Sequence, residues 1–191
     1  MQLKETSGRD FIDALEHIFE TEGSAEYLGE AVSMAEHMIQ TAMTAENNDA
    51  SEALIAACLL HDIGHFAHVS ADNSDWHRKH DEAGAKFLEG HFGAEVIEPA
   101  YLHVQAKRYL CAVEPDYFSK LSPPSVHTLE KQGGPMNADE VRVFEAHPYH
   151  GEACQLRRWE EQSKAIGVVT RRFSDYRALL ERLRIDKPTA P

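Results

Sequence analysis

The dipeptide His61-Asp62 places two different metal-binding side chains next to each other at the end of an apolar run. The run covers residues 53–60, and Ile63-Gly64-His65 follows the dipeptide. Imidazole and carboxylate together suit a first-row transition metal. Adjacent side chains on a helix point about 100° apart, so one metal would rarely bind both on a regular turn. Two neighbouring metals could share them, with the carboxylate of Asp62 as the bridge; a chance pairing is the alternative.

Other polar side chains that could bind ions recur at helical spacing. Glu30 and His37 are seven residues apart, about 20° short of two full turns, so both would face one side of a helix. Burying such groups costs on the order of several kcal/mol each unless they bind ions or one another. The remaining candidates are His61 with His65, His103 with Lys107, Arg157 with Glu160 and then Lys164, and His80 at the start of a further helix.

The elements that must position these groups are helices, because the apolar spacing is helical along most of the chain. A first amphipathic helix over residues 11–19 stops near Gly23. Ser24 is the expected N-cap of a second, which ends near Asn47. The run over 53–61 is apolar nearly all round, as a central buried helix should be. Further helices are expected over 82–89, 94–109 (bent or restarted at Pro99), 126–131, 138–146, 149–165 and 173–183.

Composition and charge limit the kind of protein. The chain has 191 residues with 42% hydrophobic content, enough for one domain with a sizeable core. We find no convincing strand, repeat or linker, so we expect a single all-α bundle over residues 1–191. The formal net charge of −13 argues against nucleic acid and anionic membranes as partners. A small anionic ligand fits if the basic residues gather locally.

Location is indicated by the cysteines and by the start of the chain. The three cysteines are odd in number and widely spaced, which predicts reduced thiols and a cytoplasmic protein. No apolar stretch approaches the roughly 20 residues that a membrane span needs. The first ten residues are polar and mixed in charge, unlike a signal peptide.

The ligand pattern resembles the HD-domain superfamily, whose signature is a His, then His-Asp, then a distant Asp. His37, His61 and Asp62 match the first three positions. The variant with two metals adds two histidines, which His80 and His103 match; His77 is the alternative to His80. The last acid in the superfamily is Asp, whereas the best-placed residue here is Glu160, with Glu161 as its rival.

A narrower resemblance runs over most of the chain, to mixed-valent di-iron oxygenases of this superfamily that cleave a carbon–phosphorus bond. The lysine-to-leucine run at 107–110 and the glutamine-to-methionine run at 132–136 are specific when found together, and they are not ordinary features of HD hydrolases. The matching stretches are Tyr27-Leu28-Gly29-Glu30, His61-Asp62-Ile63-Gly64-His65, His80-Asp81-Glu82-Ala83-Gly84-Ala85, 103–110, Ser125, 129–136 and 157–164.

The resemblance implies a complete site with two iron ions as an Fe(II)/Fe(III) pair. His37, His61 and Glu160 would hold one iron, His80 and His103 the other, and Asp62 would bridge them. Lys107, Ser125 and Arg157 would bind the phosphonate with help from His65. Tyr27 matches a tyrosine that can occupy an iron site before substrate binds, and Glu30 matches its partner acid near the amine end of the substrate.

The expected reaction uses O2 to cleave a 1-hydroxy-2-aminoethylphosphonate. Glu at position 160 and the divergent loop over 67–77 favour (R)-1-hydroxy-2-(trimethylamino)ethylphosphonate, giving glycine betaine and phosphate. A trimethylammonium prefers aromatic faces and nearby acids, for which Tyr27, Glu30, Trp76 and Tyr101 are candidates. The alternatives are the primary amine giving glycine and phosphate, a metal-dependent HD phosphohydrolase, and a non-catalytic module that senses a metal or ligand.

Overall fold

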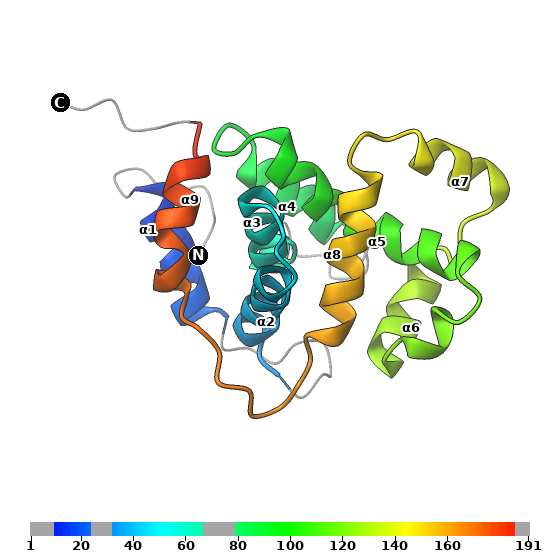
Figure 1. Ribbon diagram of the computed structural model, residues 1–191, viewed down its shortest axis with the longest axis horizontal. Coiled ribbons are helices and arrows are strands. Elements are labelled where there is room, and N and C mark those ends of the chain that lie inside the picture. The colour runs from blue at the N-terminus through cyan, green and yellow to red at the C-terminus, as the bar shows by residue number, and fades with distance from the viewer. Residues whose placement is uncertain (1–9, 24–31, 67–78, 186–191) are drawn as a thin grey trace, which may run out of the picture.

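The computed structural model describes residues 10–23, 32–66 and 79–185, and the two ends of this region lie side by side (Figure 1). Helix α1 (Phe11–Thr21) begins after Asp10, whose side chain accepts a hydrogen bond from the Ile12 amide at 2.9 Å. Asp10 also pairs with the buried Arg184 at 2.7 Å, just after α9 (Arg177–Leu183). One residue therefore caps the first helix and binds the end of the last one.

Helix α2 (Met34–Asn47) carries His37 and starts later than the sequence pattern suggested. Its N-cap is Ser33, which forms a capping box with Glu36, an arrangement that satisfies two orphan donors of the helix start. The prediction of one helix capped by Ser24 is therefore wrong where it crosses Val32 and Ser33, which are not helical. Ser24 itself lies outside the described residues. Asn48 is the C-cap, close to the expected end.

Helix α3 (Glu52–Leu60) is the buried central helix that its apolar run predicted. Seven consecutive residues, 54–60, are buried, and Ser51 caps the start. After Leu60 the chain tightens into the 3-10 turn η1 (Ile63–Phe66). The continuation of the helix to His65, on which the i, i+4 relation with His61 depended, does not occur.

Helix α4 (His80–Leu88) packs against η1 through two glycines. A Cβ added at Gly64 would lie 1.8 Å from the carbonyl oxygen of His80 and 2.6 Å from the amide nitrogen of Gly84. Only a residue without a side chain allows this approach. It fixes His80 relative to the His61-Asp62 turn.

Helix α5 (Ala94–Val113) is continuous through Pro99, so of the two expected outcomes, a bend or a restart, the restart does not occur. Pro99 is the sixth residue of the helix, and the missing N–H removes one intrahelical hydrogen bond. The ring of Pro99 is buried. The helix presents His103 and Lys107 on one side, as the i, i+4 spacing predicted.

After α5 the chain forms one end of the molecule and then runs back to the side of α1 (Figure 1). Helices α6 (Pro123–Lys131) and α7 (Ala138–Glu145) lie beyond α5 and α8 (His150–Gln162), as Figure 1 shows. The 3-10 turns η3 (Phe118–Lys120) and η4 (Phe173–Tyr176) precede α6 and α9. Helix α6 starts three residues earlier than expected, since Ser122 caps it and Pro123 fits its first turn. Helix α8 ends at Gln162, before the expected end at Ala165.

Two hydrophobic clusters hold these helices together. The larger joins α1–α4, the first part of α5, α8 and α9, and the smaller joins the second part of α5 with α6, α7 and α8. Over the residues described, no strand forms, and Phe92 and Arg184 make an isolated bridge. None of the helices in this region combines the length and apolar character needed to cross a bilayer. The expected all-α fold is confirmed.

Candidate metal centre

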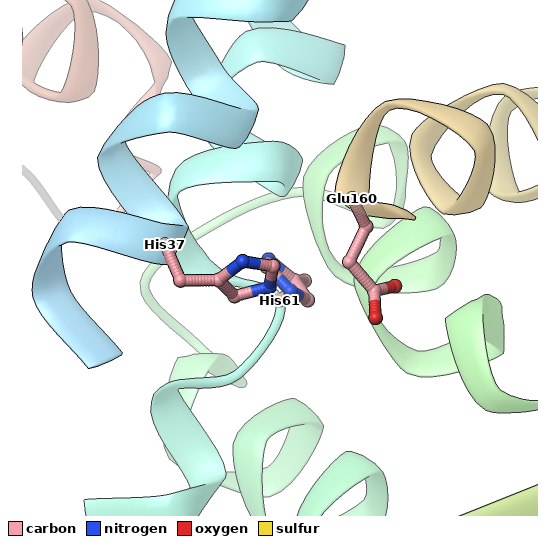
Figure 2. Close-up of side chains that lie close together, drawn as sticks. All are labelled: His37, His61 and Glu160. Carbon is pink, nitrogen blue, oxygen red and sulfur yellow. The ribbon is translucent and has the colours of Figure 1, made fainter. Parts of the chain in front are cut away.

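Helices α2 and α8 and the C-cap of α3 bring His37, Glu160 and His61 together in the interior of the protein. Each offers one ligand atom, and these atoms all lie within 4.8 Å of one another. Figure 2 shows the two rings and the carboxylate facing a common point. All three side chains are buried. We refer to these residues as the first cluster.

A second cluster forms around Asp62, next to the first. Asp62 Oδ1 lies 3.5 Å from the Nε2 atoms of both His80 and His103, and 3.7 Å from Nε2 of His65. Its other oxygen, Oδ2, lies 3.4 Å from Nε2 of His61 in the first cluster. One carboxylate therefore presents one oxygen to each cluster, which is the arrangement a bridging ligand requires.

The protonation of three histidines fits metal binding. The Nδ1 atoms of His37, His61 and His103 lie 2.9, 2.8 and 2.6 Å from the carbonyl oxygens of Ser163, Cys58 and Ala100. Because a carbonyl only accepts, each Nδ1 carries a proton, and Nε2 is the ring nitrogen available to a metal. Metal-binding histidines usually have their second nitrogen held in this way.

Several buried polar atoms in the two clusters would be satisfied by a cation. Nε2 of His61, Oδ2 of Asp62 and Oε2 of Glu160 have no hydrogen-bond partner within the described parts of the chain. Buried groups without such partners are costly, and native structures contain few of them. The residues present therefore fit a metal site.

The charges of the clusters are set by burial and by the neighbouring acids. Burial lowers the pKa of His37 and of His103 to about 4, so both are neutral ligands near pH 7. Burial opposes charge on His61 as well, but Asp62 and then Glu160 raise its pKa to about 9. Burial raises the pKa of Glu160, yet Arg157 and the nearby histidines lower it to about 2. Glu160 is therefore ionised at neutral pH.

A pocket opens beside the second cluster. Asp62, Glu160 and the three histidines 65, 80 and 103 line it, whereas His37 and His61 do not. Lys107, Arg157 and Lys164 line the same pocket, together with Ser125, Thr128 and Gln132. Cationic and hydroxyl groups thus share one cavity with the candidate metal ligands.

The cationic groups are held by specific contacts. Arg157 is buried, and its Nη1 lies 2.7 Å from Glu160 Oε1. Lys107 Nζ donates to the hydroxyl of Thr128 at 2.8 Å, and burial followed by the charge of Arg157 lowers the pKa of Lys107 to about 7. Lys164 Nζ donates to the hydroxyl of Ser125 at 2.9 Å. A dianionic group can take charge-assisted hydrogen bonds from such a set.

Most of the predicted site residues meet at this centre. The metal candidates gather as two clusters, and Lys107, Ser125 and Arg157 line the adjoining pocket. Glu160 joins the first cluster, while Glu161 faces Ser125 and Arg157. Tyr27, Glu30, His77 and Trp76 lie outside the described residues. Tyr101 is described but does not line the pocket.

Thr128 and Gln132 line the pocket but were not assigned a role from the sequence. Lys164, a candidate because of its i, i+4 step from Glu160, lines the pocket as well. Glu161, the rival metal ligand, is bound to the cationic side chains of the pocket. Thr128 stands one turn from Ser125 on α6, which follows once Ser125 is in the site.

The comparisons with known proteins agree with this centre. Residues 14–114 match the HD domain family. A [1-hydroxy-2-(trimethylamino)ethyl]phosphonate dioxygenase (glycine-betaine-forming) of Leisingera caerulea is 41% identical over 93% of this chain and 92% of its own. A hydroxymethylphosphonate dioxygenase of Gimesia maris is 38% identical over 95% of this chain and 91% of its own. An uncharacterized protein of Acanthamoeba polyphaga mimivirus is 31% identical over 88% of this chain and 80% of its own.

The chain therefore belongs to the HD-domain family, in the group of oxygenase enzymes that the two named dioxygenases represent. The resemblance inferred from the sequence motifs is confirmed, and with it a centre that binds metal.

Proposed function

We propose that the protein is a di-iron oxygenase that uses O2 to cleave the carbon–phosphorus bond of (R)-1-hydroxy-2-(trimethylamino)ethylphosphonate. The products would be glycine betaine and phosphate. The carbon–hydrogen and carbon–phosphorus bonds at C1 break, and each product gains one oxygen atom. Atoms and electrons balance with O2 as the sole oxidant, and one proton is released.

The single observation that carries this proposal is the shared cavity. Candidate metal ligands from both clusters line it, and Lys107, Arg157 and Lys164 line the same cavity. A hydrolase of phosphoesters could use a similar pair, but the named relatives of known activity are dioxygenases of phosphonates. Their substrates share a hydroxyl and a phosphonate on one carbon.

Each group of residues has a distinct task in this proposal. His37, His61 and Glu160 would hold one iron, His80 and His103 the other, with Asp62 between them. When bound, the iron pair supplies the electron transfer that activates O2. Lys107 and Arg157, with Ser125, bind the phosphonate and place C1 beside the metal ligands. His65, 3.7 Å from Asp62 and stacked on His80, assists at the same edge of the pocket.

The candidate substrates share the hydroxyphosphonate and differ in the group attached to C1, so the residues that face this group determine which substrate is accepted. No Phe, Tyr or Trp lines the pocket within the described residues, so these walls recognise the hydroxyphosphonate end that both relatives' substrates contain. The sequence offers Tyr27, Glu30, Trp76 and Tyr101 as candidates for the amine end, and of these Tyr101 does not line the pocket. We favour the trimethylated compound because the relative that acts on it is 41% identical; hydroxymethylphosphonate and the primary amine are the competing substrates.

The test is phosphate release by iron-loaded protein from all three hydroxyphosphonates, with and without O2. We expect release that requires O2, with the highest kcat/KM for the trimethylated compound. A highest kcat/KM for hydroxymethylphosphonate or for the primary amine would overturn the substrate assignment and leave the oxygenase. Phosphate release from a phosphomonoester without O2, and none from the phosphonates, would instead identify a phosphohydrolase.

A further inference from the structure

We propose that Glu161 is a positioning residue for the phosphonate end of the pocket. It would act through Arg157, Ser125 and Lys164, without touching the metals. The inference rests on the proposed function, since it concerns how that site holds its substrate.

The helical step separates Glu161 from its neighbour Glu160. Successive residues point about 100° apart on a helix. Glu160 points toward His37 and His61, whereas Glu161 points toward α6. The side chain of Glu161 is 9% exposed, so its carboxylate is largely shielded from solvent. Two adjacent acids thus serve different sides of one helix.

One oxygen of Glu161 is fixed by the backbone of α6. The amide of Ser122 donates to Oε1 at 2.7 Å. Ser122 is the N-cap of α6, and its hydroxyl accepts from the Ser125 amide. This contact joins the end of α8 to the beginning of the helix that carries Ser125 and Thr128. The carboxylate therefore has a rigid attachment that does not depend on the pocket's contents.

The other oxygen of Glu161 gathers the donors of the pocket. Oε2 lies 2.5 Å from Arg157 Nη2, 2.9 Å from Ser125 Oγ and 3.3 Å from Lys164 Nζ. Arg157 and Lys164 also donate to Ser125 Oγ, at 3.3 and 2.9 Å. All three donors line the cavity. Without Glu161, the two cations would keep only the neutral Ser125 hydroxyl as a common acceptor, with no negative charge between them.

Two physical arguments predict opposite effects of removing Glu161 on the affinity for an anion. Simple electrostatics predicts that deleting an acid next to two cations would tighten the binding of an anion. Positioning predicts the reverse, because Arg157, Ser125 and Lys164 would lose their shared orientation and would have to be ordered by the substrate itself. We propose that positioning dominates, because the anchored oxygen makes Glu161 a fixed acceptor.

The experiment compares Glu161→Ala, Glu161→Gln and Glu161→Asp in the full-length, metal-loaded protein. Glu114→Gln is the matched control, because Glu114 pairs with Arg158, the residue after Arg157, at a half-exposed position away from the pocket. The probe is methylphosphonate, which lacks the C1 hydroxyl, and its Kd is measured by calorimetry. Metal content, and KM and kcat for the favoured hydroxyphosphonate, are measured on the same samples.

We expect Glu161→Ala to weaken methylphosphonate binding and to raise KM, each about tenfold or more. Metal content should be unchanged and kcat should change much less than KM. Glu161→Asp should recover part of the loss, and Glu114→Gln should match the wild type. If Glu161→Ala does not fold, Glu161→Gln takes its place, since it keeps the shape and the acceptor for Ser122 but removes the charge.

Three results would overturn the inference: methylphosphonate binding that is tighter or unchanged in the tested variant, a loss of metal, or a fall in kcat with KM unchanged. These are separable from a failure of the proposed function. If the wild type releases no phosphate with O2 but its affinity for methylphosphonate still depends on Glu161, the proposed reaction is wrong and the positioning role stands.

Discussion

The Nε2 atoms of His80 and His103 lie 3.1 Å apart. The two rings come from α4 and α5, and Nδ1 of His103 is committed to the Ala100 carbonyl. With imidazole nitrogens about 2.1 Å from a metal, as in zinc sites, two ligands at right angles are about 3.0 Å apart. The pair therefore has the spacing of neighbouring ligands on one ion, and Asp62 Oδ1, 3.5 Å from each, supplies a third donor.

The first prediction is that the purified protein binds close to two irons per chain. The two clusters share Asp62, so partial oxidation should couple the ions and give the EPR signal of an Fe(II)/Fe(III) pair. Removal of iron with a chelator should lower the thermal midpoint, because an ion that binds only the folded chain stabilises it. A single metal per chain, or zinc alone with full activity, would contradict the di-iron assignment.

Asp62→Ala should abolish turnover and the magnetic coupling of the irons. No other carboxylate in the described region presents one oxygen to each cluster. Metal analysis and EPR measure the effect. Asp139→Ala, at an exposed position of α7, is the control and should bind iron as the wild type does. An Asp62→Ala protein that keeps a coupled pair would show that another ligand bridges.

Arg157→Ala should lower kcat/KM about 10- to 200-fold, since a buried charge-assisted hydrogen bond contributes about 1.5–3 kcal/mol. Iron content should be retained, because every proposed ligand is still present. Arg158→Ala provides the comparison: its side chain is 37% exposed and pairs with Glu114, so its kinetics should be close to wild type. Equal kinetics for both variants would remove Arg157 from the substrate site.

Glu160→Ala should lose iron, whereas Glu161→Ala should keep it. Glu160→Asp restores the residue type of the HD signature but shortens the side chain by one bond, about 1.5 Å. Glu160 Oε1 also binds Arg157 at 2.7 Å, and the shorter acid cannot keep both contacts. We therefore expect weaker iron binding and slower turnover from Glu160→Asp. Iron content and kcat equal to wild type would refute this ligand assignment.

Gly64→Ala should destabilise the protein by about 1–3 kcal/mol, the usual cost of forcing atoms into a packed interior. The added Cβ would lie 1.8 Å from the His80 carbonyl oxygen, so α4 must move and take His80 with it. Denaturation and iron content report the two effects. Gly151→Ala is the control, because nothing lies within 4 Å of the position its Cβ would take. Similar stability losses in both would exclude the packing explanation.

The helical fold could be predicted because it follows from local patterns, whereas the gathering of the ligands was implied by the resemblance to the HD-domain superfamily. The buried run before His61 and the i, i+4 relation of His103 and Lys107 need no knowledge of the fold. The start of α2 was missed because the apolar spacing over 24–39 looked like one helix. The local signal was present in Ser33 and Glu36, which are spaced as a capping box.

Other features depend on contacts between distant segments, which local patterns do not carry. His65 would lie one helical turn from His61 if the helix continued that far, but η1 intervenes and places His65 against Asp62. In a 3-10 turn, residues three apart lie on the same side. Glu160 lies with the metal candidates and Glu161 contacts α6 because of where α2 and α6 lie around α8. The spacing of the two acids alone left both as candidate ligands.

The first cluster joins residues that are 123 positions apart, and α2 is bound to the chain after α8 by His37 with Ser163 and by Gln40 with Ala165. A ribosome that has released only the first 150 residues has therefore produced a chain without a complete site. Protein synthesis proceeds at about 5–20 residues per second, so a growing chain exposes its histidines for several seconds before Glu160 is available. A metal ion can therefore enter a complete first cluster only after Glu160 has been made, and a chain that stops before Glu160 lacks one of the three ligands of that cluster.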